Sequence, residues 1–362
     1  MSNGGGVLRR PAVPLPVRTR RDVNNLAAND PIITLYRDAI GVMKGRDLRD
    51  PTSLRYQAAI HSYPSSVATT ADRRDRAKNV FPDFVDPRAE DRDYPLPTDR
   101  DTFWRQCQHG SWFFLSWHRM YIHFFEKMIM DIVKNRPGGS DWALPYWNYS
   151  ASDAAALLPA PFRGSTLPDG TTNHLFVPER MAEANDGKPF LDMIPLPNGR
   201  PSTNRDPAKP HTSLNFLRQR PPARGGNRFL GPVNQSHFSQ PFGSLESVPH
   251  GSVHVQTGGA NGFMTDFVTA PLDPIFWLHH CNVDRLWEVW VQRQKQLGNL
   301  DRNPKNAGRA NIGGWLDEPF EFHDETKARV PMTSRQVLNS RLPPLSYEYE
   351  DTSDPFNGAP NT

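Results

Sequence analysis

Histidines spaced like metal ligands are the residues of this chain that most clearly point to chemistry. Seven of its twelve histidines fall into three short groups: His109, His118 and His123; His250 and His254; and His279 with His280. A lone buried histidine is usually a hydrogen-bonded core residue. Several gathered in this way favour a metal site, because imidazole is a common ligand of transition metals.

His250 and His254 are one helical turn apart, so both rings can reach one ion from the same face of a helix. The three residues between them include no glutamate. A zinc protease places a glutamate general base directly after the first histidine of such a pair. The pattern therefore argues against a hydrolytic zinc site.

His109 and His118 are nine positions apart, which on one continuous helix would point their side chains about 180° apart. One rigid helix cannot aim both at a single ion. Gly110-Ser111 allows His109 to lie on a loop that folds back against the helix of His118. His61 is the only histidine further upstream and is the natural third ligand.

Two other histidines are predicted to lie outside the ligand sets. On a regular helix His123 points about 140° away from His118, and His279 points about 100° away from His280. We expect His123 in the core or behind the ligands, and His279 behind them. Asp284, four residues after His280, is expected to orient that ring or to pair with an arginine.

The predicted ligands form two sets of three histidines without a carboxylate: His61, His109 and His118, then His250, His254 and His280. Magnesium, calcium and di-iron centres rely on carboxylate oxygens, so these sets favour copper or zinc. Copper fits better, because neutral imidazoles can stabilise both of its oxidation states.

Helices are predicted around each set, over 31–45, over 51–61, over 117–132 and from 274 onward. Three of them begin with an Asp-Pro pair, which supplies an N-cap and a proline suited to the first helical position. One spacing occurs twice, as Phe114-x3-His118-x7-Glu126 and as Phe276-x3-His280-x7-Glu288. This repeat predicts two similar helices that each present one histidine to a shared centre.

Composition predicts a compact core wrapped in long loops. Hydrophobic residues make up 37% of the chain, and its 36 prolines are about twice the average frequency. Loops are expected over 72–101, 150–240 and from 298 onward. The arginines near the start are expected to form a tail on the surface: Arg9, Arg10, Arg18, Arg20 and Arg21.

Charge and apolar patterning exclude several classes of partner. The net charge of +3 gives no case for binding nucleic acid or a membrane surface, so a small molecule is the expected partner. No apolar run approaches the roughly 18 residues of a membrane span, and no export signal is visible. We therefore expect a cytoplasmic protein. Two cysteines, Cys107 and Cys281, are too few for a disulfide framework.

The motifs resemble those of the type-3 copper family, which includes tyrosinases, catechol oxidases (polyphenol oxidases) and haemocyanins. Residues 107–119, with Glu126, are similar to the family's copper-A motif, and 273–287 to its copper-B motif. The resemblance also covers 17–23, 144–148 and Tyr347-Glu348-Tyr349. It implies one catalytic domain over 17–349, with tails at 1–16 and 350–362 and no shielding domain.

The resemblance implies a mainly helical fold with few short strands, in which a central four-helix bundle holds a dinuclear copper site among long loops. It implies that dioxygen is the co-substrate and that o-diphenols leave as o-quinones, with weaker monophenol hydroxylation. Full tyrosinase activity, o-aminophenol oxidation and haemocyanin-like oxygen carriage stay open as alternatives.

Further roles follow from the resemblance alone. Cys107 matches the cysteine that many members join to the following histidine, here His109, by a thioether bond. Glu246 matches the glutamate that holds a water near copper B, and Phe267 matches the bulky gate residue of plant-type catechol oxidases.

Two positions of the copper-B segment bear on the choice of substrate. Gly251 stands where several efficient tyrosinases have asparagine, which puts strong monophenol hydroxylation in doubt. Val255, which follows His254, predicts an apolar pocket wall.

Overall fold

The protein is mainly helical. The computed structural model describes residues 16–62, 102–104, 106–191, 215–218, 242–298 and 315–356. The predicted loop over 72–101 lies outside the described residues, as does much of 192–241. Among the helices that are described, none is long and apolar enough to cross a membrane.

The first two helices begin with side-chain caps. Helix α1 (Pro31–Gly45) starts at Asp30, whose carboxylate accepts the Ile32 N–H, as the sequence predicted. Helix α2 (Leu54–His61) starts later than the predicted residue 51, because the cap is Ser53 rather than Asp50. Its end at His61 is confirmed.

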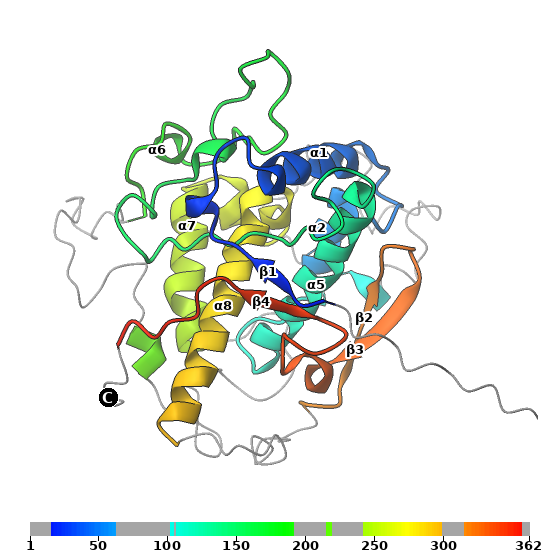
Figure 1. The fold of residues 1–362 in the computed structure, drawn as a ribbon, viewed down its shortest axis with the longest axis vertical. Helices are drawn as coiled ribbons and strands as arrows, with labels where there is room; N and C mark the ends of the chain where they lie inside the picture. Colours follow the sequence, from blue (N-terminus) through cyan, green and yellow to red (C-terminus); the bar gives the residue numbers. More distant parts are fainter. Residues whose placement is uncertain are drawn as a thin grey trace, which may run out of the picture.

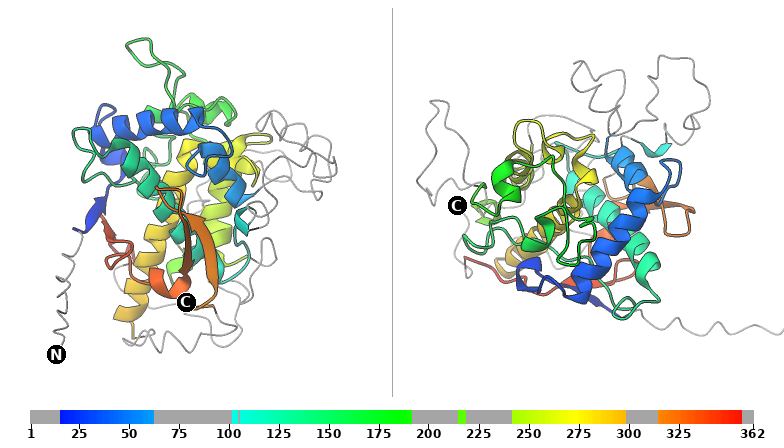
Figure 2. Two further views of the ribbon diagram at one scale, coloured as in Figure 1. Left: turned by 90° about the vertical axis from the view of Figure 1, so that its right-hand side faces the viewer. Right: turned by 90° about the horizontal axis from the view of Figure 1, so that it is seen from above.

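Two long helices cross the centre of the molecule and pack against each other (Figure 1). Helix α5 (Phe113–Val133) is buried along most of its length and begins four residues before the predicted start. Helix α8 (Pro274–Gln296) begins at the predicted cap, Asp273. Helix α1 lies across the end at which α8 begins, where the Tyr36 hydroxyl donates to the Pro274 carbonyl (Figure 2).

The segment before α8 is a run of short turns. A π-helical segment, η4 (Glu246–Gly251), continues into helix α7 (Ser252–Gly258). The 3-10 turns η5 (Phe263–Thr265) and η6 (Ala270–Leu272) then lead to α8. Helix α6 (Ala182–Asn185) and the turns η1 (Val23–Asn25), η2 (Ala160–Phe162) and η3 (Asn215–Arg218) lie in the connecting loops.

Two small sheets complete the described fold. Strand β1 (Arg18–Arg20) pairs in parallel with β4 (Tyr347–Tyr349), so the two ends of the described chain meet (Figure 1). Strands β2 (Pro319–His323) and β3 (Arg329–Thr333) form an antiparallel hairpin that leads into the turn η9 (Ser334–Val337). Packing continues past residue 349, since Arg293 pairs with Asp354.

The expectation of a surface tail is wrong for Arg20, whose side chain is fully buried beside α5 and α8, while Arg9 and Arg10 lie outside the described residues. Its guanidinium donates to both carboxylate oxygens of Glu126, at 3.1 and 2.9 Å, and to the Tyr349 hydroxyl. Asp284 accepts hydrogen bonds from Arg119, Tyr347 and Tyr349, which confirms its predicted arginine partner. Burying these charges is tolerated because they are paired.

Candidate metal centre

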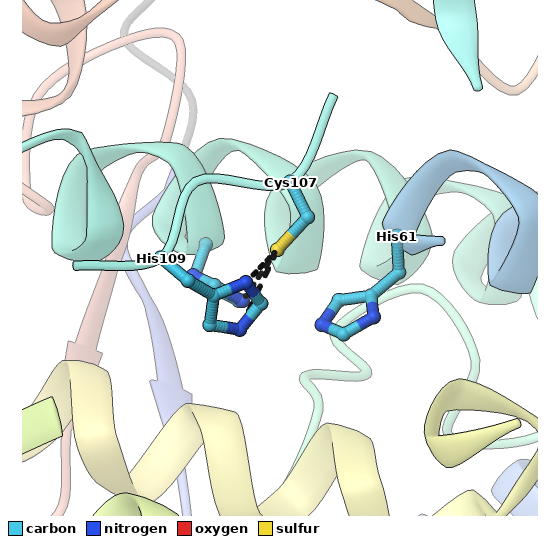
Figure 3. A group of neighbouring side chains, drawn as sticks. His61, Cys107 and His109 are labelled. Atoms are coloured by element: carbon cyan, nitrogen blue, oxygen red, sulfur yellow. Dashed lines mark hydrogen bonds between the residues drawn. The ribbon is translucent and has the colours of Figure 1, made fainter. Parts of the chain in front are cut away.

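Four side chains that could together hold a metal ion, here called the A group, converge beside α5: His61, Cys107, His109 and His118. Their potential ligand atoms all lie within 4.8 Å of one another. The ring centroids of His61, His109 and His118 are 5.3 to 5.8 Å apart. Figure 3 shows His61 reaching in from the end of α2, while Cys107 and His109 come from the loop before α5.

The segment that carries His109 is a loop, as the sequence predicted. Gly110 follows with a φ of +66°, a conformation that glycine adopts at little cost and other residues rarely do. Its N–H donates to the Glu246 carboxylate at 2.8 and 3.0 Å. The loop is therefore held from the opposite side of the centre.

A second set, here called the B group, consists of His250, His254, His279 and His280, whose potential ligand atoms also lie within 4.8 Å of one another. The rings of His250 and His254 are 4.7 Å apart, as expected for side chains one turn apart. The Nε2 atoms of His254 and His280 face each other at 3.2 Å. Such a short distance between two neutral nitrogen atoms is typical of ligands that converge on a metal position.

The A and B groups are neighbours in space. The rings of His118 and His280 are stacked with centroids 4.4 Å apart and an interplanar angle of 8°. The His109 and His250 rings are 6.3 Å apart. Metals held by the two groups would be close enough to share a small bridging ligand.

Backbone carbonyls orient four of the six predicted ligand rings. In each case Nδ1 lies 2.7 to 2.8 Å from a carbonyl oxygen, with His61 paired to Phe267, His118 to Phe114, His250 to Glu246 and His254 to Met264. A neutral histidine that donates from Nδ1 presents its lone pair at Nε2. These contacts therefore select the tautomer that binds metal through Nε2.

Burial keeps the same histidines neutral. It lowers the pKa of His118 to about 3 and the pKa values of His250 and His280 well below the ordinary value of 6.5. A metal must displace any proton from its ligand, so histidines that stay neutral down to acidic pH suit metal binding. The donor set fits a nitrogen-liganded transition metal, including copper.

Cys107 faces the edge of the His109 ring. Its Sγ lies 3.5 Å from Nδ1 and 3.8 Å from Nε2 of that ring, so it is turned toward the carbon between the two nitrogens (Figure 3). The sulfur is also 3.3 Å from Nε2 of His118. Burial raises the pKa of the thiol.

Glu246 is buried, and burial raises the pKa of its carboxyl group to about 8. Gly251 is the last residue of the π-helical segment that Glu246 begins. A Cβ added at Gly251 would be 3.3 Å from the Glu246 carbonyl oxygen. Val255 is 51% exposed and follows His254, which is itself partly exposed. The three residues are thus gathered along η4 and α7.

Phe267 lies over the A group. Its ring is stacked on His61 at a centroid distance of 6.3 Å and meets the His109 ring edge-on at 4.8 Å. Its carbonyl is the acceptor for His61. One residue therefore both orients a predicted ligand and covers that side of the centre.

Sequence reasoning missed several contributors. His279, which was expected behind the ligands, lies close to the other B-group rings and is stacked on His250 at 5.4 Å and 18°. The four carbonyl acceptors carry no side-chain signal, so no residue pattern could have found them. His123 is buried and belongs to neither group, as predicted.

Two family descriptions match the chain. Residues 51–293 match the common central domain of tyrosinase, and residues 313–360 match a polyphenol oxidase middle domain. The first match contains both histidine groups. The second contains the hairpin β2–β3 and the strand β4.

Individual relatives agree with these matches. Tyrosinase HcTyr1 of Hahella sp. (strain CCB-MM4) is 32% identical over 339 residues, which are 92% of this chain and 63% of that protein. A chloroplastic polyphenol oxidase of Spinacia oleracea is 30% identical over 94% of this chain and 48% of its own length. The chain thus spans less than two thirds of either relative.

Solved structures share the fold. The structure of latent apple tyrosinase superposes with a TM-score of 0.63 at 25% identity, covering 96% of this chain and 66% of that one. The Grenache (Vitis vinifera) polyphenol oxidase gives a TM-score of 0.62 at 23% identity, covering 97% of this chain and 94% of that one.

Proposed function

Because the chain belongs to the tyrosinase family of type-3 copper proteins, we propose that it is a dinuclear copper oxidase that converts o-diphenols into o-quinones. The observation that carries the proposal is the meeting of two histidine groups, with His118 and His280 in contact at the boundary between them. Two copper ions held close together could between them accept the two electrons that an o-diphenol gives up.

We assign His61, His109 and His118 to one copper and His250, His254 and His280 to the other, held by a four-helix bundle of α2, α5, α7 and α8. His279 is left out of the set because on α8 its side chain points about 100° away from that of His280, and its ring stacks on His250 at 5.4 Å. Its place behind His250 suits a supporting residue. The pairing of β1 with β4 supports one catalytic domain over 17–349.

Two copper ions bound there would supply reversible dioxygen binding and accept the electrons of the substrate. Overall, two o-diphenols and one dioxygen give two o-quinones and two waters. The chain's part is to keep the ligands neutral and correctly turned, through burial and the carbonyl contacts. Glu246, whose pKa burial raises to about 8, is in its ionised form a stronger base than a surface glutamate.

A substrate would approach past Val255 and Phe267. Val255 is exposed beside His254, and Phe267 covers His61 and His109, so an aromatic ring meets apolar walls on both sides. Gly251 offers no side chain to help Glu246 hold a water. Diphenols, which lose their protons more easily than monophenols, are therefore the favoured substrates.

We also propose a thioether between Cys107 and His109. The sulfur faces the ring carbon to which it would bond. The S–C bond forms with loss of the thiol hydrogen and the ring C–H hydrogen, and dioxygen, the proposed co-substrate, takes up both hydrogens and their two electrons as hydrogen peroxide. A peptide pair lighter by two hydrogens would support the link. Free alkylation of Cys107 in copper-loaded protein would contradict it.

The decisive test is oxygen consumption by copper-loaded protein with a catechol, a monophenol and an o-aminophenol in parallel. We expect the catechol to be turned over fastest. A faster o-aminophenol reaction would identify an aminophenol oxidase, and equal monophenol turnover a full tyrosinase. Reversible oxygen binding without turnover of any of the three would indicate a haemocyanin-like carrier and would defeat the enzyme proposal.

A further inference from the structure

Two phenylalanines at equivalent positions lie against both histidine groups. Phe114 precedes His118 by four residues on α5, and Phe276 precedes His280 by four residues on α8. Each is therefore one turn before the histidine that its helix contributes, on the same helix face. Both are buried, at 2% and 0% exposure.

Phe114 lies on the helix that contributes His118 to the A group, and its ring also contacts the B group. Its ring centroid is 4.6 Å from that of His118 on its own helix and 4.7 Å from that of His250 in the B group. His109 is a third neighbour, at 5.9 Å. Phe114 thus packs between ligands proposed for different metals.

Phe276 lies on the helix that contributes His280 to the B group, and its ring also contacts the A group. Its ring lies 4.2 Å from His280 on its own helix and 5.2 Å from His61 in the A group, which it meets nearly at right angles. His254 is its third neighbour, at 5.6 Å. Each phenylalanine therefore contacts two histidines of its own group and one of the other.

A phenyl ring is suited to a spacer at this place. It has no atom that could ligate a metal or hydrogen-bond to a bridging ligand, and it is rigid beyond its two side-chain torsions. Packed interiors resist compression, so a ring wedged between two ligands limits how closely they approach. The neighbours are rings as well, which leaves little freedom for slippage.

We propose that Phe114 and Phe276 are positioning residues that set the separation of the two metal sites. Each acts through the histidines it contacts. The inference rests on the proposed function, because it requires two bound copper ions. It adds to that function a structural reason why both ions are held at a distance that one small ligand can bridge.

The test compares Phe114→Leu, Phe276→Leu and the double variant with Phe113→Leu. Phe113 is a matched control, since it is buried to the same 2% on the same helix but packs on Phe320 of β2. Each copper-loaded protein is measured for bound copper, for its electron paramagnetic resonance signal and for the copper–copper distance by X-ray absorption. Two cupric ions joined by a bridging ligand couple and give little resonance signal.

We expect the control and the wild type to keep two coupled coppers. The Phe114 and Phe276 variants should keep both coppers but change their distance and lose coupling, so that most of the copper becomes visible by resonance. Their kcat should fall about 100-fold, the usual cost of a misplacement of about 1 Å. Phe114→Met and Phe276→Met, which refill part of the volume, should recover part of the coupling.

Three outcomes would overturn the inference: unchanged coupling and distance in the double variant, the same change in the Phe113 control, or loss of copper from both the leucine and methionine variants. In the last case the rings would serve to retain the metals instead of spacing them. A wild-type protein that binds fewer than two coppers would instead refute the proposed function, and the two failures are thereby distinguishable.

Discussion

The A and B groups hold similar ligands but are built in different ways. The B group comes from one turn across η4 and α7 together with the adjacent pair on α8. The A group combines the end of α2, a loop and α5, which only tertiary packing brings together. Local helical geometry thus sets the spacing within each half of the B group, and packing of α8 against η4 joins the halves, whereas the A group also depends on what holds its loop.

Helices α5 and α8 share the spacing Phe-x3-His-x7-Glu, but residues at matching positions have different partners. His118 is oriented by the Phe114 carbonyl one turn earlier, whereas Nδ1 of His280 has no hydrogen-bond partner among the described residues. Glu126 pairs with Arg20 from β1, and Glu288 pairs with Arg119 from α5. Similar sequence positions therefore acquire different partners once the chain folds.

Loss of a ligand should have the largest effect in either group. His118→Ala and His250→Ala are each expected to lose one copper and to lower kcat by at least about 1000-fold, since a metal contributes several kcal/mol to catalysis. Metal analysis should find one copper per chain. If either variant keeps two coppers, the ligand assignment for that group is wrong.

Glu126 and Glu288, which occupy matching positions on α5 and α8, should differ in their contribution to the stability of the fold. Burial alone would raise the pKa of Glu126, but Arg20 and Arg18 lower it to about 2, so it is ionised and paired at neutral pH. Glu126→Gln leaves Arg20 buried and should cost about 3–5 kcal/mol. Glu288→Gln should cost less, because that carboxylate is 16% exposed. Urea unfolding measures both, and equal costs would contradict the proposed asymmetry.

Acid should destabilise the metal-free protein. The pKa values of His118, His250 and His280 are lowered on folding, so below pH 6.5 the unfolded chain binds protons that the folded chain does not. Stability is therefore lost as the pH falls from 6.5 toward about 3. At pH 5 each such histidine costs about 2 kcal/mol.

Urea unfolding at pH 7 and pH 5 tests this dependence. His118→Phe and His250→Phe should each remove one histidine's share of the loss, one from each group. A metal-free wild type that is equally stable at the two pH values would show that these histidines are not kept neutral by burial.

Gly251→Asn should have the smallest effect, confined to the B side. An added Cβ would lie 3.3 Å from the Glu246 carbonyl oxygen, so the side chain fits after a small adjustment. We expect monophenol turnover to rise relative to diphenol turnover by up to about tenfold, the value of one hydrogen bond of about 1.4 kcal/mol. Parallel assays of both substrates give the ratio, and Gly251→Ala is the control.

Much of the site could be predicted from the sequence, because helical periodicity is a local property. The spacing of His250 and His254, the Asp-Pro caps of α1 and α8, and the glycine that places His109 on a loop follow from residue types alone. The predicted start of α2 was wrong because Ser53, and not Asp50, is the N-cap, with its hydroxyl accepting the Tyr56 N–H.

Tertiary structure decided which distant groups meet. The sequence predicted that Arg20 belongs to a basic surface tail, yet its side chain is buried. The Glu126 carboxylate compensates its charge and the Tyr349 hydroxyl accepts a hydrogen bond from it, and both lie more than 100 residues away along the chain. Likewise, only the packing of the chain brings main-chain carbonyls of residues such as Phe267 and Met264 to the rings that they orient. Spacing along one helix can indicate what a side chain could bind, but partners from other segments are set by how the chain packs.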